Sequence, residues 1–131
     1  MLKEQIKEKG KRKMKIIKSK GINGAAEMYK LTKGEGVAKM KEANGQILEL
    51  AAYILYEEER PDAEGEIQSR PVCAIMTPNG ERYGTNSGTF VRTFLDMLDV
   101  FEANNEEVHA IRVLVKKSRA GREFVTCDYE N

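Results

Sequence analysis

The chain has 131 residues and a hydrophobic fraction of 40%, which is typical of one globular domain rather than of a disordered segment. Its net charge of +1 hides an asymmetry: residues 1–20 hold nine Lys or Arg and two Glu, a net of +7, and the remaining residues have a net of −6. No apolar run approaches the roughly 18 residues of a membrane span, and the basic start has no apolar block after it, which excludes a secretory signal.

The front of the chain predicts a basic arm followed by short elements. Residues 1–20 are interpreted as a flexible arm, within which 14–19 is compatible with a short strand, and residues 21–131 as a single domain. The segment 25–32 is Ala-rich like a helix but short, and strand is the favoured assignment. Residues 37–45 then predict a helical turn that ends at Asn44-Gly45.

Alternating apolar residues predict the longest strand at 46–58. One face is apolar, whereas the opposite face, which includes Tyr53, is semi-polar and is predicted to look outward. After an acidic loop at 57–66, a second strand follows at 67–77, where Pro71 predicts an edge or a bulge at its start. A tight turn at 78–81 leads to a returning strand at 82–85.

The second half predicts one helix and one hairpin. Ser87 is a suitable N-cap for an amphipathic helix at 88–102, whose apolar stripe is expected to be core. Strands at 108–118 and 122–130 flank a turn at 119–121. The predicted fold class is α+β, mostly β: an OB-like, antiparallel, five-stranded, partly open barrel with one main helix.

Residues that could support catalysis or bind a metal are scarce. Cys73 and Cys127 lack metal-ligand spacing and are interpreted as small buried side chains in a reducing compartment, the cytoplasm. His109 lies in a strand-like run, where a lone histidine is more often structural than catalytic. The glycines of Gly34-Glu35-Gly36 lack the rest of a phosphate loop. We therefore expect no enzyme, no metal and no cofactor.

Cations and aromatic residues occur together at several places, which indicates a nucleic-acid surface. Such a surface needs cations to replace counterions and flat rings to stack on bases. The candidates are Tyr29, Lys30, Lys33, Tyr53, Arg82, Tyr83, Lys116, Lys117, Arg119, Arg122 and Phe124, together with Lys11, Arg12 and Lys13 of the arm. Basic hairpin tips also protect edge strands, so the turn at 116–122 is compatible with either role.

The order of the motifs resembles a known family. The hairpin-to-helix join reads Asn79-Gly80, Tyr83, Thr85 and Ser87, and the terminal hairpin reads Ser118, Gly121, Arg122 and Phe124. Over about residues 27–129 the chain resembles the small single-stranded-DNA-binding proteins of tailed bacteriophages, in particular those with protein-primed replication. The resemblance implies an OB-like β fold, no catalysis, and sequence-tolerant coating of displaced strands during replication.

Two functions therefore remain open from the sequence. The first is single-stranded DNA binding through phosphate contacts and base stacking, with single-stranded DNA and replication proteins as partners and no membrane. The second is a phage protein-interaction module that docks on or inhibits a host protein through its acidic surface, because an acidic loop such as 57–66 can imitate nucleic-acid charge. For the join that begins at Thr85, the simplest interpretation is a helix cap by Ser87. The resemblance implies that Arg82 and Tyr83, just before the join, lie beside the path of the bound DNA strand.

Overall fold

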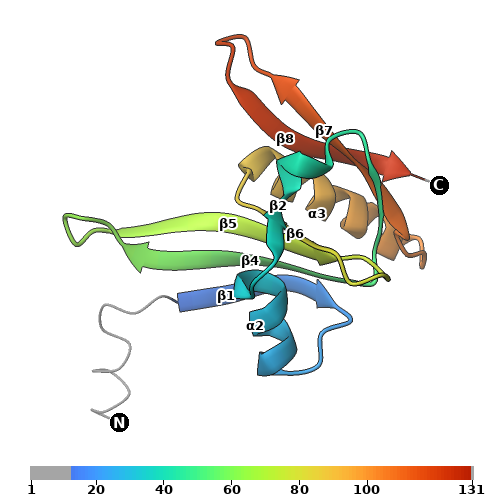
Figure 1. Ribbon diagram of the computed structural model, residues 1–131, viewed down its shortest axis with the longest axis horizontal. Coiled ribbons are helices and arrows are strands. Elements are labelled where there is room, and N and C mark those ends of the chain that lie inside the picture. Colours follow the sequence, from blue (N-terminus) through green and yellow to red (C-terminus); the bar gives the residue numbers. More distant parts are fainter. Residues whose placement is uncertain (1–12, 131) are drawn as a thin grey trace.

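The computed structural model describes residues 13–130, which form two open sheets and two α-helices (Figure 1). One sheet has five strands in the order β1-β4-β5-β6-β2, and the other has three in the order β3-β7-β8. The elements are β1 (Lys13–Lys20), α2 (Ala25–Lys33), β2 (Val37–Lys39), the 3₁₀ helix η1 (Met40–Ala43), β3 (Ile47–Glu49), β4 (Ala52–Pro61), β5 (Ile67–Met76), β6 (Arg82–Thr85), α3 (Gly88–Ala103), β7 (Ala110–Lys117) and β8 (Glu123–Glu130). The predicted α+β, mostly β class is confirmed.

The long strand predicted at 46–58 is divided between the two sheets. Leu48 of β3 pairs with Ile111 of β7, whereas Ala52 begins the pairing of β4 with β5. At the break, the amide of Leu50 donates to the carbonyl of His109 at 2.9 Å, and the next amide donates to the carbonyl of Met76 at the same distance. This segment therefore joins the two sheets.

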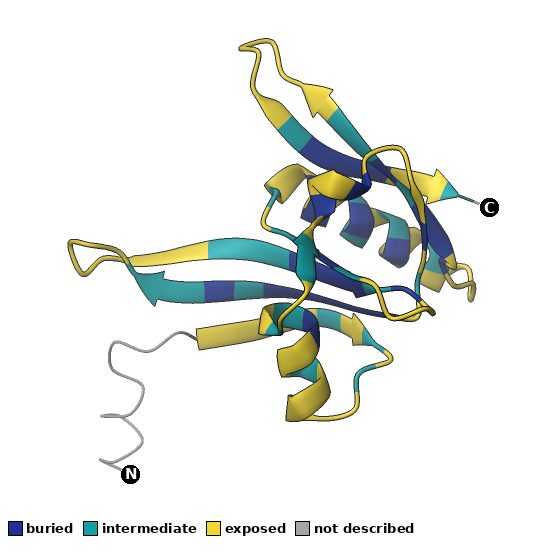
Figure 2. Cartoon of the chain, in the orientation of Figure 1, coloured by how far each residue is buried: buried dark blue, intermediate teal, exposed yellow. Residues whose placement is uncertain are grey.

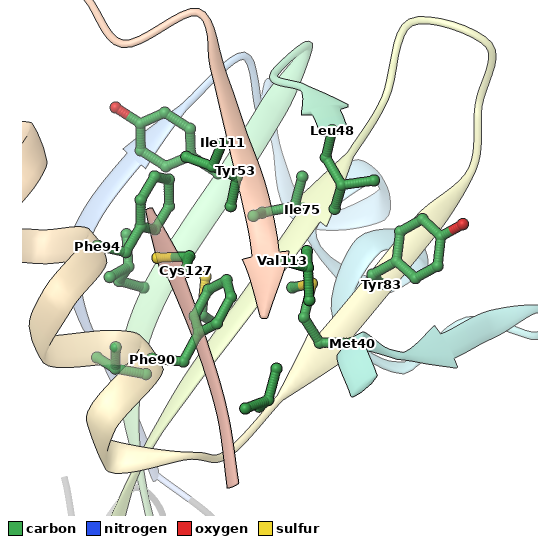
Figure 3. Close-up of a cluster of buried hydrophobic side chains, with 14 of the residues drawn as sticks. Met40, Leu48, Tyr53, Ile75, Tyr83, Phe90, Phe94, Ile111, Val113 and Cys127 are labelled. Carbon is green, nitrogen blue, oxygen red and sulfur yellow. The ribbon is translucent and has the colours of Figure 1, made fainter. Parts of the chain in front are cut away.

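Both faces of β4 are buried from Ala52 to Tyr56, which corrects the prediction of an outward-looking face on this strand. Tyr53 and Leu55 join the main core with α3 and the second sheet, and Tyr53 packs edge-on against Phe94 with ring centroids 5.3 Å apart. Figure 3 shows the rings of Tyr53 and Phe94 next to each other. Ile54 and Tyr56, on the opposite face, pack in a second cluster with Leu31 of α2. Alternation identified which residues share a face, but not that each face is covered.

The segment predicted as a strand at 25–32 is instead the helix α2. Its Ala, Glu, Met, Lys and Leu residues have high helix propensity, and Leu31 is buried against the sheet. At the start of the helix, the Glu27 carboxylate accepts a hydrogen bond from the amide of Asn23 at 2.8 Å. The predicted helical turn at 37–45 is confirmed in part: Val37–Lys39 form the strand β2, and the 3₁₀ helix η1 ends at Ala43, with Asn44 as its C-cap.

Residues 13–20 belong to the sheet, so for them the prediction of a flexible arm is wrong and the strand at 14–19 is confirmed. Strand β1 pairs with β4 from Lys13 opposite Glu59 to Lys20 opposite Tyr53. The Lys18 ammonium group forms ion pairs with Asp99, at 2.9 Å, and with Glu102, which link β1 to the end of α3. Lys11 and Arg12 lie outside the described residues.

The strand β5 has a free side where Pro71 lies. β6 pairs with β5 only from Cys73 onward, so in the first half of β5 only β4 is hydrogen-bonded to it. Proline has no N–H to donate and is tolerated at such an edge. The predicted edge position is therefore confirmed, and the β4–β5 hairpin extends beyond the rest of the sheet with an exposed tip (Figure 2).

The predicted cap of the main helix is confirmed at Ser87. Its Oγ accepts a hydrogen bond from the amide of Phe90 at 3.3 Å and donates to the carbonyl of Val125 in β8 at 2.8 Å. One hydroxyl group thus satisfies a free helix N–H and links α3 to the terminal hairpin.

We expect Ser87→Ala to lower the free energy of unfolding by about 1–2 kcal/mol, because it removes the cap and leaves the Val125 carbonyl without this donor. Urea denaturation followed by circular dichroism measures the change. Thr89→Ala is the control, since Thr89 is exposed in the first turn of the same helix. Equal midpoints for wild type and Ser87→Ala would contradict this role.

The two thiols are buried, as predicted. Burial raises the pKa of Cys73 well above its usual value and raises the pKa of Cys127 to about 12. Both thiols are therefore protonated and unreactive at neutral pH. Within residues 13–130, neither α-helix combines the length and apolar character needed to cross a membrane.

Candidate nucleic-acid interface

A groove with a volume of about 870 Å³ lies between three parts of the molecule. Strands β4, β5 and β6 contribute one part, the segment from the end of α2 to the start of η1 contributes the second, and the β7–β8 hairpin contributes the third. Figure 1 shows the β4–β5 and β7–β8 hairpins projecting from the body in different directions. The groove therefore collects residues that are far apart in the sequence.

The charged residues of the groove are mostly cations. The lining includes four of them, Lys33, Lys39, Lys41 and Arg70, against two carboxylates, Glu58 and Glu123. Lys39 and Lys41 are exposed on either side of Met40, which is fully buried. The burial of Met40 therefore fixes the backbone between the two lysines while their ammonium groups remain accessible.

One aromatic side chain of the groove is accessible to a ligand. Phe124 is half-buried in β8, opposite Lys116 of β7, and lines the groove. Tyr56 also lines the groove but is fully buried. A ring at a groove wall beside cations can stack on a base while the cations contact phosphates.

The basic tip of the β7–β8 hairpin continues from the same wall. Lys116, Lys117, Arg119 and Arg122 are all exposed. The turn is well defined: the amide of Ser118 donates to the carbonyl of Arg122 at 2.9 Å, and Gly121 has a φ of 82°, a left-handed conformation that favours glycine. The tip is therefore a basic surface of defined shape next to the groove.

The guanidinium group of Arg82 is hydrogen-bonded to the protein's own backbone and is not left for a ligand. Its Nη1 donates to the carbonyl of Lys30 at 2.7 Å and its Nη2 donates to that of Glu35 at 2.5 Å. It thereby holds the connection between α2 and β2, which supplies one side of the groove. Tyr29 and Lys30 are exposed on α2 but do not line the groove.

Tyr53 and Tyr83, which the sequence pointed to as stacking residues, lie in the core. Their exposed fractions are 7% and 8%, and both belong to the main hydrophobic cluster. Burial raises the pKa of Tyr83, so its phenol is neutral. Figure 3 shows the Tyr83 ring against the cluster with its hydroxyl group directed away from the other labelled side chains. Neither ring offers a face to a base.

The structure thus divides the predicted site residues into groups. Lys33 and Phe124 line the groove, the four tip cations lie next to it, and Lys13 lies at the start of β1. Three groove cations were missed by sequence reasoning: Lys39, Lys41 and Arg70. Two of them flank a buried methionine, a pattern that indicates an ordered segment, but only the tertiary structure brings them into the same groove as Phe124.

The join between β6 and α3 has two roles. Besides the cap at Ser87, the three residues Thr85, Asn86 and Ser87 all line the groove.

Within the described residues, His, Cys, Asp and Glu side chains form no group of three or more that could hold a metal ion.

Comparisons with known proteins agree on one family. Residues 8–130 match the model of a family described as "Phage Single-stranded DNA-binding protein". A protein of Bacillus phage B103 named "Single-stranded DNA-binding protein" is 28% identical over 93 residues, which cover 70% of this chain and 75% of that protein. No solved structure matches this chain.

Proposed function

Because the chain belongs to the phage single-stranded DNA-binding protein family, we propose that it binds single-stranded DNA without catalysis during phage DNA replication inside the host cell. The observation that supports this most directly is the groove that places Lys39, Lys41 and Phe124 around one channel. The basic hairpin tip extends the same surface. Binding is sequence-tolerant, because phosphates and ring faces are common to all nucleotides.

The proposed binding mode separates phosphate contacts from stacking. Lys39 and Lys41, with the tip cations, neutralise phosphates, and Phe124 stacks on a base. Contacts with about four phosphates would give a log–log slope of affinity against salt of about −3. Tyr53, Tyr83 and Arg82 act as scaffold, and Tyr29 and Lys30 are assigned no contact. Three cations at and before the start of β1 contribute long-range attraction: Lys11, Arg12 and Lys13.

The proposal includes an OB-like arrangement of the strands. In that fold, three consecutive antiparallel strands precede the helix and two follow it, and the connecting hairpin loops flank the ligand face. Here β4, β5 and β6 precede α3, and β7 and β8 follow it. The strand β3, which directly precedes β4 in the chain, pairs with β7 and so links the two groups of strands. In this interpretation β1, α2 and β2 are additions at the front of the chain.

Titration of the whole protein against poly-dT at several salt concentrations tests the proposal. We expect a band shift at micromolar protein and a slope near −3. No shift, or an affinity independent of salt, would overturn it. The comparisons give no support to the alternative of a module that docks on a host protein, and the interaction with replication proteins stays a proposal.

We expect the double variant Lys39→Gln and Lys41→Gln to make the salt slope shallower by about 1.4, since each lost phosphate contact on a single strand contributes about 0.7. At 0.1 M salt this corresponds to an affinity about 25-fold lower. Lys15→Gln with Arg92→Gln is the control, because both are exposed, neither lines the groove, and the net charge changes equally. Equal losses in the two double variants would contradict the proposed path of the DNA.

A further inference from the structure

A buried carboxylate lies among the cations of the groove. The Glu58 side chain is only 5% exposed, and its Oε2 is 2.6 Å from the Lys33 ammonium group. Its Oε1 lies 3.5 Å from Nη2 of Arg70 and 4.0 Å from Nε of Arg60. We call these four residues the Glu58 cluster. Three of its members, Glu58, Lys33 and Arg70, line the groove.

The chemistry of the Glu58 cluster differs from that of the other groove cations. Lys39 and Lys41 are exposed, and the described ion pairs include neither of them. Lys33 and Arg70, in contrast, share one carboxylate that is almost out of contact with water. A negative charge at that depth is only weakly screened by salt, so it acts on the potential of the groove at any ionic strength.

We propose that Glu58 is a built-in counterion that limits the affinity of the groove for the DNA backbone. The inference rests on the proposed function and adds a residue that sets its strength. The carboxylate cancels one positive charge of the cluster, so an incoming phosphate competes with Glu58 for Lys33 and Arg70. A protein whose affinity is set below its electrostatic maximum dissociates faster from the strand, since affinity changes within one interface appear mostly in the dissociation rate.

The same carboxylate also has a structural contact, which offers a competing explanation. Through Lys33, the last residue of α2, Glu58 ties that helix to β4. If this tether were its whole role, removing the charge would loosen α2 and leave DNA binding unchanged or weaker. The built-in counterion predicts the opposite sign, so the two explanations are separable by one measurement.

The test is the variant Glu58→Gln, compared with wild type as the whole protein. Both are titrated against poly-dT at NaCl concentrations from about 0.05 M to about 0.5 M. Because one more positive charge is available to phosphate, we expect the salt slope to become steeper by about 0.7 and the affinity at 0.1 M salt to rise about fivefold. Glu58→Asp, which keeps the charge, should retain the wild-type slope.

Glu57→Gln is the matched control, because Glu57 precedes Glu58 on β4, has the same charge and does not line the groove. We expect its slope to equal that of wild type. An equal steepening in Glu57→Gln and Glu58→Gln would mean that net charge alone acts, which overturns the inference. Unchanged or weaker binding by folded Glu58→Gln overturns it as well.

A second pair of variants tests the inference even if Glu58→Gln does not fold. Lys33→Met should make the slope shallower by about 0.7, and the double variant Lys33→Met with Glu58→Gln should return it to the wild-type value. Replacing both partners of an ion pair is better tolerated than leaving one charge buried alone. No recovery in the double variant overturns the inference. If wild type itself does not bind poly-dT, the proposed function fails together with the inference. If wild type binds but the variants do not behave as expected, only the inference fails.

Discussion

Phe124→Ala is expected to weaken binding of single-stranded DNA about 5- to 150-fold, because a base stacked on an aromatic ring contributes about 1–3 kcal/mol. Phe124 is the half-buried ring at the wall of the groove, opposite Lys116 in the terminal hairpin. Since the ring is uncharged, the loss should be the same at every salt concentration and the salt slope should not change. Fluorescence anisotropy of labelled oligo-dT at several salt concentrations measures both quantities.

Tyr29→Ala is the control for Phe124→Ala. Tyr29 is 63% exposed, the largest exposed fraction among the large hydrophobic residues described, but it lies on α2 outside the groove. We expect Tyr29→Ala to bind single-stranded DNA with an affinity within about twofold of that of wild type. Equal losses in both variants would mean that the DNA crosses α2. No loss in Phe124→Ala, with the fold intact, would remove stacking on this ring from the binding mode.

Tyr83→Ala is expected to lower the free energy of unfolding by about 3–5 kcal/mol, the range for removing a large aromatic side chain from a core. Tyr83 is 8% exposed and packs in the main hydrophobic cluster. Domains of this size have a total stability of about 5–15 kcal/mol, so this loss is about a fifth of it or more. Urea denaturation followed by circular dichroism measures it.

Tyr83→Phe separates the ring from the hydroxyl group. It keeps the buried ring, so we expect a change in unfolding free energy below about 1.5 kcal/mol and unchanged DNA affinity. A folded Tyr83→Ala protein of wild-type stability with much weaker DNA binding would contradict the core assignment. That result would restore the role in stacking that the motif around Tyr83 predicts.

The contrast between Phe124 and Tyr83 shows where sequence reasoning about this surface succeeds and fails. Both rings lie within two residues of an arginine in the sequence, Arg122 and Arg82, and both were predicted to stack on bases. In the structure, Arg122 is exposed at a hairpin tip, whereas Arg82 binds two backbone carbonyls. Proximity of a cation and a ring in the sequence does not determine which of them faces solvent, because alternate residues of a strand point to opposite faces.

The amino-acid sequence by itself determined the features that depend on neighbours in the chain. Turn residues and alternation located β6 at 82–85 and the terminal hairpin, and the 3.6-residue period with Ser87 located α3. The same local motifs carried the resemblance to the phage family, which the family match over residues 8–130 confirms. These signals are short-range, so no knowledge of distant partners was needed.

The tertiary structure decided which residues meet. The parallel pairing of β2 with β6 brings Lys39 and Lys41 to the groove, and the division of one apolar run into β3 and β4 brings the terminal hairpin to the same place. Packing of Leu31 against the sheet adds to the helix propensity of α2, and α3 with the second sheet covers the face of β4 that carries Tyr53. Each of these outcomes depends on contacts between segments far apart in the chain. Local periodicity specifies which side chains share a face, whereas long-range pairing decides what covers that face.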